Sequence, residues 1–232
     1  MTIETYCLAR NEEKMIPYLM RHYGQFSKVI LLESNSTDRT VEIAKSMGAD
    51  VWSFQSKDEI NDLWFLELKN NCWKESTADW VIIIDSDEFV FHPNLVKVLE
   101  ETKATIFEPR LFNMYSKKFP TTNKQIYNEI KYGVEDRRKM NLFRPKEITE
   151  INYTAGCHSA KPEGNVILSD KDIKTLHMRF LSLEYVLQRN KESLRRLSEL
   201  NKQMGWGFHL YHEETMCIRE FERGLRDSVK VI

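Results

Sequence analysis

Two aspartates that directly follow an apolar run are the residues best suited to chemistry in this sequence. Residues 80–84 (Trp-Val-Ile-Ile-Ile) lead into Asp85-Ser86-Asp87, and so short an apolar run predicts a strand buried on both faces. Ligands bind at the carboxyl ends of such strands. If the chain stays extended through Ser86, the two carboxylates lie on one side, roughly 6.5–7 Å apart. Two oxygen ligands so placed suit a hard divalent cation that also holds a phosphate, and a plain acidic turn is the alternative.

The elements before this motif alternate between strand and helix. Strands are predicted at 3–8, 29–33, 50–54 and 80–84, and helices between them at 16–24, 41–48 and 61–75. Such alternation over about 85 residues is typical of right-handed β-α-β units around a parallel sheet. We therefore expect an α/β fold with the acidic motif at the carboxyl edge of its central sheet.

The second half of the chain has a looser pattern. It predicts a helix at 94–102, a long functional loop at 113–133, and short strands at 104–108, 140–144, 151–154, 165–168 and 173–179. A long amphipathic helix from Ser182 to Met204 is followed by a last helix from Glu213 to Arg226. One compact domain with a helical C-terminal extension is the simplest interpretation.

Composition narrows the class of protein. The formal net charge of −1 over 232 residues argues against a general nucleic-acid or anionic-membrane surface. No apolar run approaches the ~20 residues of a membrane span, and the first residues lack the layout of a signal peptide. The four cysteines are widely spaced and form no Cys-x-x-Cys pair. A reduced, cytoplasmic protein is the expectation.

Four segments, in this order, resemble the family 2-type glycosyltransferases of the nucleotide-sugar (GT-A) fold. They are residues 9–13 (Ala-Arg-Asn-Glu-Glu), 33–40 (Glu-Ser-Asn-Ser-Thr-Asp-Arg-Thr), 69–70 (Lys-Asn) and 79–89 around Asp85-Ser86-Asp87. Order and spacing make them more specific together than singly. The resemblance implies a GT-A domain over 1–180, with a nucleotide-binding half at 1–90, an acceptor and metal-site half at 91–180, and a helical extension at 181–232.

The resemblance also implies roles for single residues near the donor. Arg10 and its neighbour Glu12 would line the donor nucleotide, and Glu33 stands where the family usually has an aspartate that contacts the base or ribose. Asp85, with Ser86 beside it, would face the ribose. Asp87 would bind a divalent metal, Mn²⁺ or Mg²⁺, that bridges the donor diphosphate. Lys69 lies where a basic residue can approach the donor, and a solvated helix lysine is its alternative.

The remaining roles concern the acceptor and the metal. An inverting transfer needs a carboxylate that takes the acceptor proton, and the family's x-Glu-Asp element matches Val134-Glu135-Asp136. Asp136 is preferred as the base over Glu135, with a charged helix start as the alternative. Related enzymes often complete the metal shell with a histidine. His158, in a polar turn, is preferred over His177, which lies in an apolar strand, and an imidazole would favour Mn²⁺.

The predicted function is therefore transfer of a sugar from a nucleotide-sugar donor, such as a UDP- or GDP-sugar, to a glycan or other hydroxyl acceptor. No nucleic-acid partner is expected, and the 182–204 helix could support a homodimer. A haloacid-dehalogenase phosphatase is disfavoured because three strand–helix units precede the motif. A nucleotidyltransferase is disfavoured because residues 8–15 contain no glycine. A non-catalytic sugar-nucleotide-binding relative stays open, and donor hydrolysis separates it from an enzyme.

Overall fold

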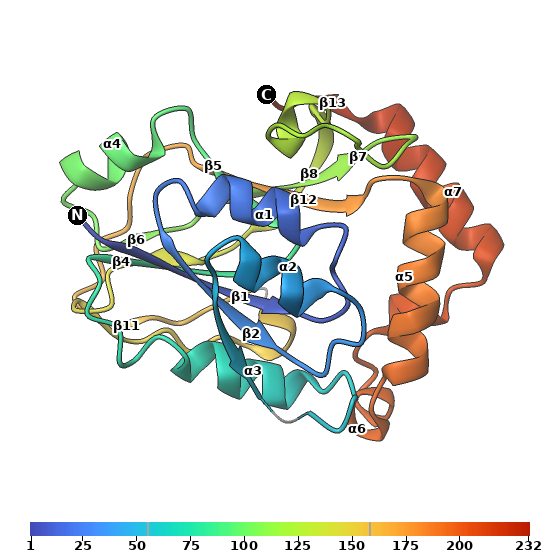
Figure 1. Cartoon of the computed structure of the whole chain (residues 1–232), viewed down its shortest axis with the longest axis horizontal. Coiled ribbons are helices and arrows are strands. Elements are labelled where there is room, and N and C mark those ends of the chain that lie inside the picture. Colours follow the sequence, from blue (N-terminus) through green and yellow to red (C-terminus); the bar gives the residue numbers. More distant parts are fainter. Residues whose placement is uncertain (55, 158) are drawn as a thin grey trace.

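A six-stranded sheet in the order β3-β2-β1-β4-β9-β6 forms the centre of the molecule (Figure 1). The structure, a computed structural model, describes residues 1–54, 56–157 and 159–232. Four strands run parallel: β1 (Ile3–Ala9), β2 (Lys28–Glu33), β3 (Asp50–Ser53) and β4 (Trp80–Asp85). Strand β9 (Leu142–Phe143) is antiparallel to β4, and β6 (Ile106–Phe107) is antiparallel to β9. The predicted α/β class with a mostly parallel sheet is confirmed.

Helices cover both faces of this sheet. Helices α1 (Ile16–Tyr23), α2 (Thr40–Ser46) and α4 (Leu95–Glu101) share one apolar cluster with Ile82 and Ile84. Helix α3 (Asp62–Asn71) packs against a second cluster that contains Val81 and Ile83. Successive β4 side chains thus enter opposite cores, because strand side chains alternate between faces. The prediction of a strand buried on both faces is confirmed.

A second sheet, in the order β13-β8-β7-β12-β5, follows the acidic motif. It comprises β5 (Glu88–Phe91), β7 (Arg110–Tyr115), β8 (Tyr132–Arg138), β12 (Lys174–Phe180) and β13 (Val229–Lys230). The predicted 113–133 loop is therefore too long at both ends, and residues 135–138 are strand rather than a helix start. Strand β8 escaped prediction because most of its side chains are charged and exposed, which leaves no apolar alternation.

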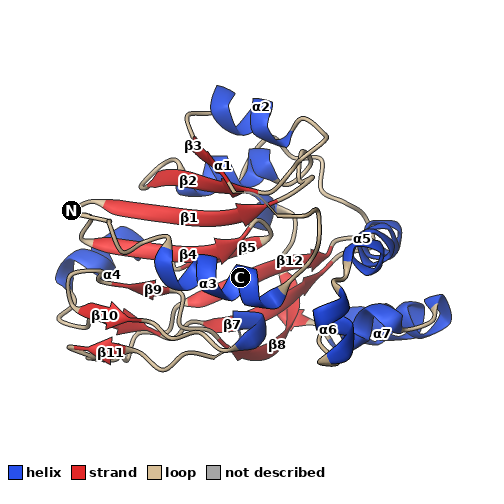
Figure 2. Ribbon diagram, turned by 90° about the horizontal axis from the view of Figure 1, so that it is seen from below, coloured by secondary structure: helices blue, strands red, loops and turns tan. Residues whose placement is uncertain are grey.

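The C-terminal helices gather at the carboxyl ends of the parallel strands (Figure 2). The predicted 182–204 helix is divided into α5 (Leu183–Arg196) and α6 (Glu199–Gln203), and α7 (Glu214–Asp227) is the last helix. The interruption has a clear cause. Ile60 forms backbone hydrogen bonds with Arg196 and Ser198, and the Ser198 side chain caps α6 by accepting from Asn201 N–H. Because α6 begins only a few residues after α5 ends, the helical spacing of apolar residues continues across the break and predicted a single helix.

The short elements differ from prediction by a few residues. Strands β10 (Ile148–Glu150) and β11 (Glu163–Gly164) pair with each other, whereas strands were predicted at 151–154 and 165–168. Single-turn helices lie at η1 (Ile126–Asn128), η2 (Ala155–Cys157) and η3 (Phe208–Tyr211). In the part of the chain that the structure describes, every helix is too short or too polar to cross a membrane.

Candidate active site

A turn at Ser86 and Asp87 separates the two aspartates of the motif. Strand β4 ends at Asp85 and β5 begins at Glu88, so the expected extended path through Ser86 is wrong. The two carboxylates consequently have different partners. Asp85 contacts lysines from α3 and from the segment after β8, whereas Asp87 contacts side chains from β12 and α5.

Asp85 is partly exposed and belongs to a group of alternating charges whose other members are buried. Its Oδ1 lies 2.6 Å from Lys69 Nζ, and its Oδ2 lies 3.5 Å from Lys139 Nζ. Lys139 also donates to both oxygens of Glu88, at 2.7 and 2.8 Å. Although burial alone would raise it, these two ammonium groups hold the pKa of the Asp85 carboxyl well below its usual range. Asp85 is therefore a fixed anion, and Lys69, 4% exposed, is not the solvated lysine of the alternative interpretation.

Asp87 is almost fully buried and faces two basic side chains. Its Oδ2 lies 2.7 Å from Arg189 Nη1 and 3.6 Å from His177 Nε2. The other imidazole nitrogen of His177 lies 2.8 Å from Asn113 Oδ1, so it donates to that oxygen, and Nε2 is directed toward Asp87. Burial opposes ionisation of Asp87, but Arg189 and then His177 outweigh it and hold the pKa of the carboxyl well below its usual range.

Arg189 also joins the motif to the residues after β1. Its Nη2 lies 3.0 Å from Glu12 Oε1, so one guanidinium bridges two carboxylates. Burial and, to a smaller extent, the neighbouring Asp87 raise the pKa of Glu12 to about 7 against the opposing effect of Arg189.

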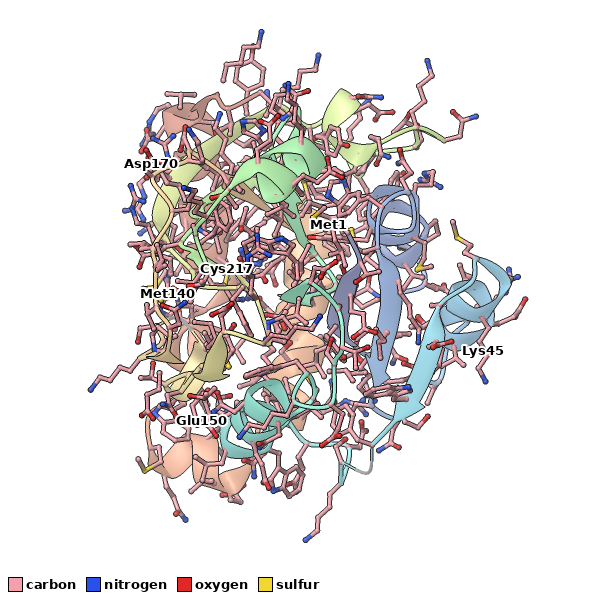
Figure 3. All side chains as sticks on the ribbon, turned by 90° about the vertical axis from the view of Figure 1, so that its left-hand side faces the viewer. Met1, Lys45, Met140, Glu150, Asp170 and Cys217 are labelled. Atoms are coloured by element: carbon pink, nitrogen blue, oxygen red, sulfur yellow. The ribbon has the colours of Figure 1, made fainter. Side chains whose placement is uncertain are left out.

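Two cavities meet at Asp85 and Arg189. The smaller, about 190 Å³, lies at the carboxyl ends of β1 and β2 and is lined by Arg10, Glu12, Ser86 and other residues. The larger, about 610 Å³, is within the usual ligand-pocket range of ~300–1,000 Å³ and extends toward the second sheet. Cys217, labelled in Figure 3, lies on its wall. Since Asp85 and Arg189 line both cavities, a ligand that spans the two cavities lies beside these residues.

The other predicted donor residues lie at the small cavity or just behind it. Arg10 Nη2 lies 2.6 Å from Asp58, and Nη1 lies 2.5 Å from Glu192, which fixes the guanidinium on the cavity wall. Glu33 is 6% exposed, and its carboxylate accepts from Ser36 N–H and from Ser53 Oγ. Glu33 therefore shapes the loop after β2 in this conformation, and the cavity lining does not include it.

The two base candidates have different surroundings. Strand β8 carries one extra residue between the pairs Phe112–Glu135 and Leu111–Arg137, and that residue is Asp136. Such a bulge redirects a side chain, and bulges are frequent beside active sites. Asp136 lines the large cavity together with Asp87 and His177. Glu135 is half exposed, lies 3.7 Å from Arg110 and is not on the cavity wall.

Comparison with known proteins adds a family to this geometry. The sequence model of glycosyl transferase family 2 matches residues 8–159, which is more than half of the chain. The chain belongs to glycosyl transferase family 2. The GT-A fold that the motifs implied agrees with this assignment and with the mostly parallel sheet.

Individual relatives of this family 2 chain match over shorter stretches. A glucosyl-3-phosphoglycerate synthase from Petrotoga mobilis is 36% identical over 98 residues, which cover 37% of this chain and 30% of that protein. A 4,4'-diaponeurosporenoate glycosyltransferase from Staphylococcus haemolyticus is 34% identical over 85 residues, covering 34% and 22%. The aligned part is therefore less than a third of each relative's own length.

Solved structures match at low similarity. S. aureus TarS is 15% identical, with 95% of this chain and 43% of that chain covered and a TM-score of 0.47. Glucosyl-3-phosphoglycerate synthase from Mycobacterium tuberculosis is 26% identical over 47% of this chain and 44% of that chain, with a TM-score of 0.33.

The side chains around Asp87 are of the kinds that bind divalent metals, but they do not form a complete set of ligands. Among the described residues, no group of three or more His, Cys, Asp or Glu side chains is arranged to hold an ion. One carboxylate oxygen and one imidazole nitrogen do face each other at 3.6 Å, and such mixed ligands suit Mn²⁺. His177 is therefore the predicted histidine that lies beside Asp87, and the other candidate, His158, lies outside the described residues.

Sequence reasoning missed Arg189, Lys139 and Asn113. Arg189 lies on an amphipathic helix, where an arginine usually indicates the solvent-facing side, and 177 residues separate it from Glu12 in the sequence. Lys139 follows Arg137 and Arg138 in the sequence, and such a basic cluster usually indicates a solvated surface. Asn113 lay inside the predicted loop, and its role depends on the register between β7 and β12, which pairs it with His177.

Proposed function

We propose that this chain is a metal-dependent glycosyltransferase that moves a sugar from a nucleotide-sugar donor to an acceptor hydroxyl, with inversion. The observation that supports it best is the convergence of Asp85, Asp87 and Asp136 on one cavity from three different strands and turns. This cavity adjoins the smaller cavity, which is lined by residues 9–12 after β1. This arrangement offers separate places for a nucleoside, a diphosphate and a transferable sugar.

Each side chain at the junction of the two cavities has a chemical task in this proposal. The nucleoside lies in the small cavity near Arg10 and Ser86, and Asp85, held ionised by its two lysines, accepts hydrogen bonds from ribose hydroxyls. Asp87 and His177 hold the divalent metal. When bound there, a metal supplies Lewis-acid stabilisation of the charge that develops on the departing diphosphate.

Asp136 is proposed as the general base. It takes the proton from the acceptor hydroxyl while the oxygen–carbon bond to the sugar forms and the sugar–phosphate bond breaks. Its carboxylate is held by Arg137 at 2.9 Å and by Asn113 at 3.4 Å. Because Asn113 also binds His177, one amide orients both the base and the predicted metal ligand.

A UDP- or GDP-sugar and Mn²⁺ or Mg²⁺ are the proposed ligands. Crystal structures of the Mycobacterium tuberculosis synthase contain UDP with Mn²⁺ or with Mg²⁺, and that enzyme shares its name with the Petrotoga relative. The acceptor is proposed only as a hydroxyl compound. Dimerisation through residues 182–204 remains a prediction, as does a cytoplasmic location.

A thermal-shift screen of nucleoside diphosphates with and without Mn²⁺ tests the proposal. A ligand at 100 times its Kd stabilises the folded state by about 2.7 kcal/mol. For a chain of this size that corresponds to a rise in Tm of roughly 5–11 °C, at about 2–4 °C per kcal/mol. We expect such a rise for UDP or GDP with Mn²⁺ and a smaller one without it. Absence of any metal-dependent shift across the nucleotides would contradict the proposal.

A further inference from the structure

Arg189 bridges Glu12, which follows β1, and Asp87, which follows β4. It lies outside residues 8–159, the region that the family model matches. It lies on α5, and its guanidinium contacts Asp87 Oδ2 at 2.7 Å and Glu12 Oε1 at 3.0 Å. The same Nη1 donates to Tyr185 Oη at 3.0 Å, one helical turn earlier. The contact is therefore built by α5 rather than by the motifs themselves.

The Arg189 guanidinium already donates to the carboxylate oxygen that a metal held by Asp87 and His177 would use. Asp87 Oδ2 is the atom that faces His177 Nε2, and it is also the atom to which Arg189 donates. Two buried carboxylates, Glu12 and Asp87, share this single cation. A second cation at Asp87 must overcome the positive charge of Arg189, or Arg189 must move away.

The position of Arg189 also matches the path of a donor. It lines both the small cavity and the large cavity, as Asp85 does. A donor with its nucleoside in one cavity and its sugar in the other brings its diphosphate to this point. Arginine binds phosphate oxygens through paired hydrogen bonds at least as readily as it binds carboxylates.

A second arginine strengthens the attraction for an anion. Arg179, on β12, lines the large cavity, and its guanidinium donates to Asn190 Oδ1 at 3.0 Å. Among the described residues, no carboxylate lies within ion-pairing distance of Arg179.

We propose that Arg189 exchanges partners when the donor binds: it holds Asp87 and Glu12 in the free protein and turns to the donor diphosphate in the complex. The inference rests on the proposed function, since it takes the ligand to be a nucleotide sugar. The exchange leaves Asp87 Oδ2 free beside His177 Nε2. Nucleotide and metal then bind with positive coupling, and each raises the affinity of the other by the same factor.

Counting free Mn²⁺ by electron paramagnetic resonance tests the exchange without an activity assay. In the wild type we expect weak Mn²⁺ binding alone and roughly 5–150-fold tighter binding with saturating UDP or GDP, the range usual for coupled sites. In Arg189→Gln, Mn²⁺ alone should bind several-fold tighter than in the wild type, and the gain from nucleotide should shrink. Nucleotide affinity itself should fall.

Controls make the test specific. Arg195→Gln removes the same charge from an exposed site on α5 that lines none of the described cavities, and it should leave Mn²⁺ binding unchanged. If Arg189→Gln does not fold, Arg189→Lys serves, because an ammonium lacks the planar fork of donors with which the guanidinium contacts Asp87, Glu12 and Tyr185 together. Equal Mn²⁺ affinity of the wild type and the Arg189 variant without nucleotide overturns the exchange, and so does failure of both to bind Mn²⁺. If neither nucleotide binds, the proposed function fails, while the comparison with Mn²⁺ alone still decides whether Arg189 competes for Asp87.

Discussion

Replacing Asp136 by asparagine is expected to lower sugar transfer by roughly 10²–10⁴-fold, the usual contribution of a positioned general base. The amide keeps the shape of the side chain and its contact with Asn113 but cannot accept the proton. Donor and metal binding should change by only a few-fold, because Asp136 reaches neither Asp87 nor Arg189 in the described structure. The measurement is the transfer rate at saturating donor, together with the donor affinity from calorimetry.

Glu135→Gln is the matched control for this prediction. Glu135 is the neighbouring carboxylate, and its side chain points to Arg110 rather than into the cavity. The Glu135→Gln substitution should therefore lower the transfer rate only slightly. A normal transfer rate in Asp136→Asn with a severe loss in Glu135→Gln would move the base one residue earlier. A normal rate in both variants would remove the Glu-Asp element from the mechanism.

Asp87→Ala is expected to abolish metal-dependent donor binding while the protein stays folded. Changing a residue that only supports a metal ligand costs roughly 10–100-fold in metal affinity, so removal of a direct ligand should cost at least as much. The fold should survive because Arg189 retains Glu12 as its partner. The measurement is calorimetric titration of UDP or GDP with Mn²⁺ into the variant, with circular dichroism to verify folding.

Asp170→Ala provides the control for a lost carboxylate. Its side chain is 91% exposed and lies near the edge of the molecule in Figure 3. The Asp170→Ala protein should bind nucleotide and Mn²⁺ as the wild type does. Full metal-dependent nucleotide binding by a folded Asp87→Ala protein would show that the metal uses ligands other than Asp87.

The sequence allowed prediction of the first half of the fold because each strand there is a short apolar run that ends in polar residues. Trp80–Asp85 is the clearest case, since five apolar residues stop at a carboxylate. The place of the motif at the carboxyl edge follows from parallel strand order alone. The four parallel strands therefore had an unambiguous local signal.

The second half depends on contacts that are distant in sequence. The strand β8 is mostly charged and exposed, so its pairing with β7 and β13 has no local signature, and neither has the bulge that places Asp136 in the cavity. Lys139 and Arg189 are similar. Each would be an ordinary surface cation on its own element, and each becomes part of the site only because tertiary packing brings it to Glu88 or Asp87.

The turn at Ser86 and Asp87 illustrates a third kind of limit. Period-two alternation placed Asp85 and Asp87 on one side, and that required an extended chain. The antiparallel pairing of β5 with β12 needs the chain to change direction directly after β4. Asp85 is consequently fixed by lysines and Asp87 by an arginine and a histidine, a division of partners that spacing alone does not reveal.

The central claim is that this edge of the sheet binds and activates a nucleotide sugar, and donor turnover tests it most directly. A panel of UDP- and GDP-sugars is incubated with the protein and Mn²⁺, and released nucleoside diphosphate is measured over time, with water as the acceptor. We expect release from at least one donor that depends on the metal and is lost in Asp87→Ala. If no donor in the panel is bound or cleaved with Mn²⁺ or Mg²⁺, or if Asp87→Ala cleaves a donor at the wild-type rate, the claim is contradicted.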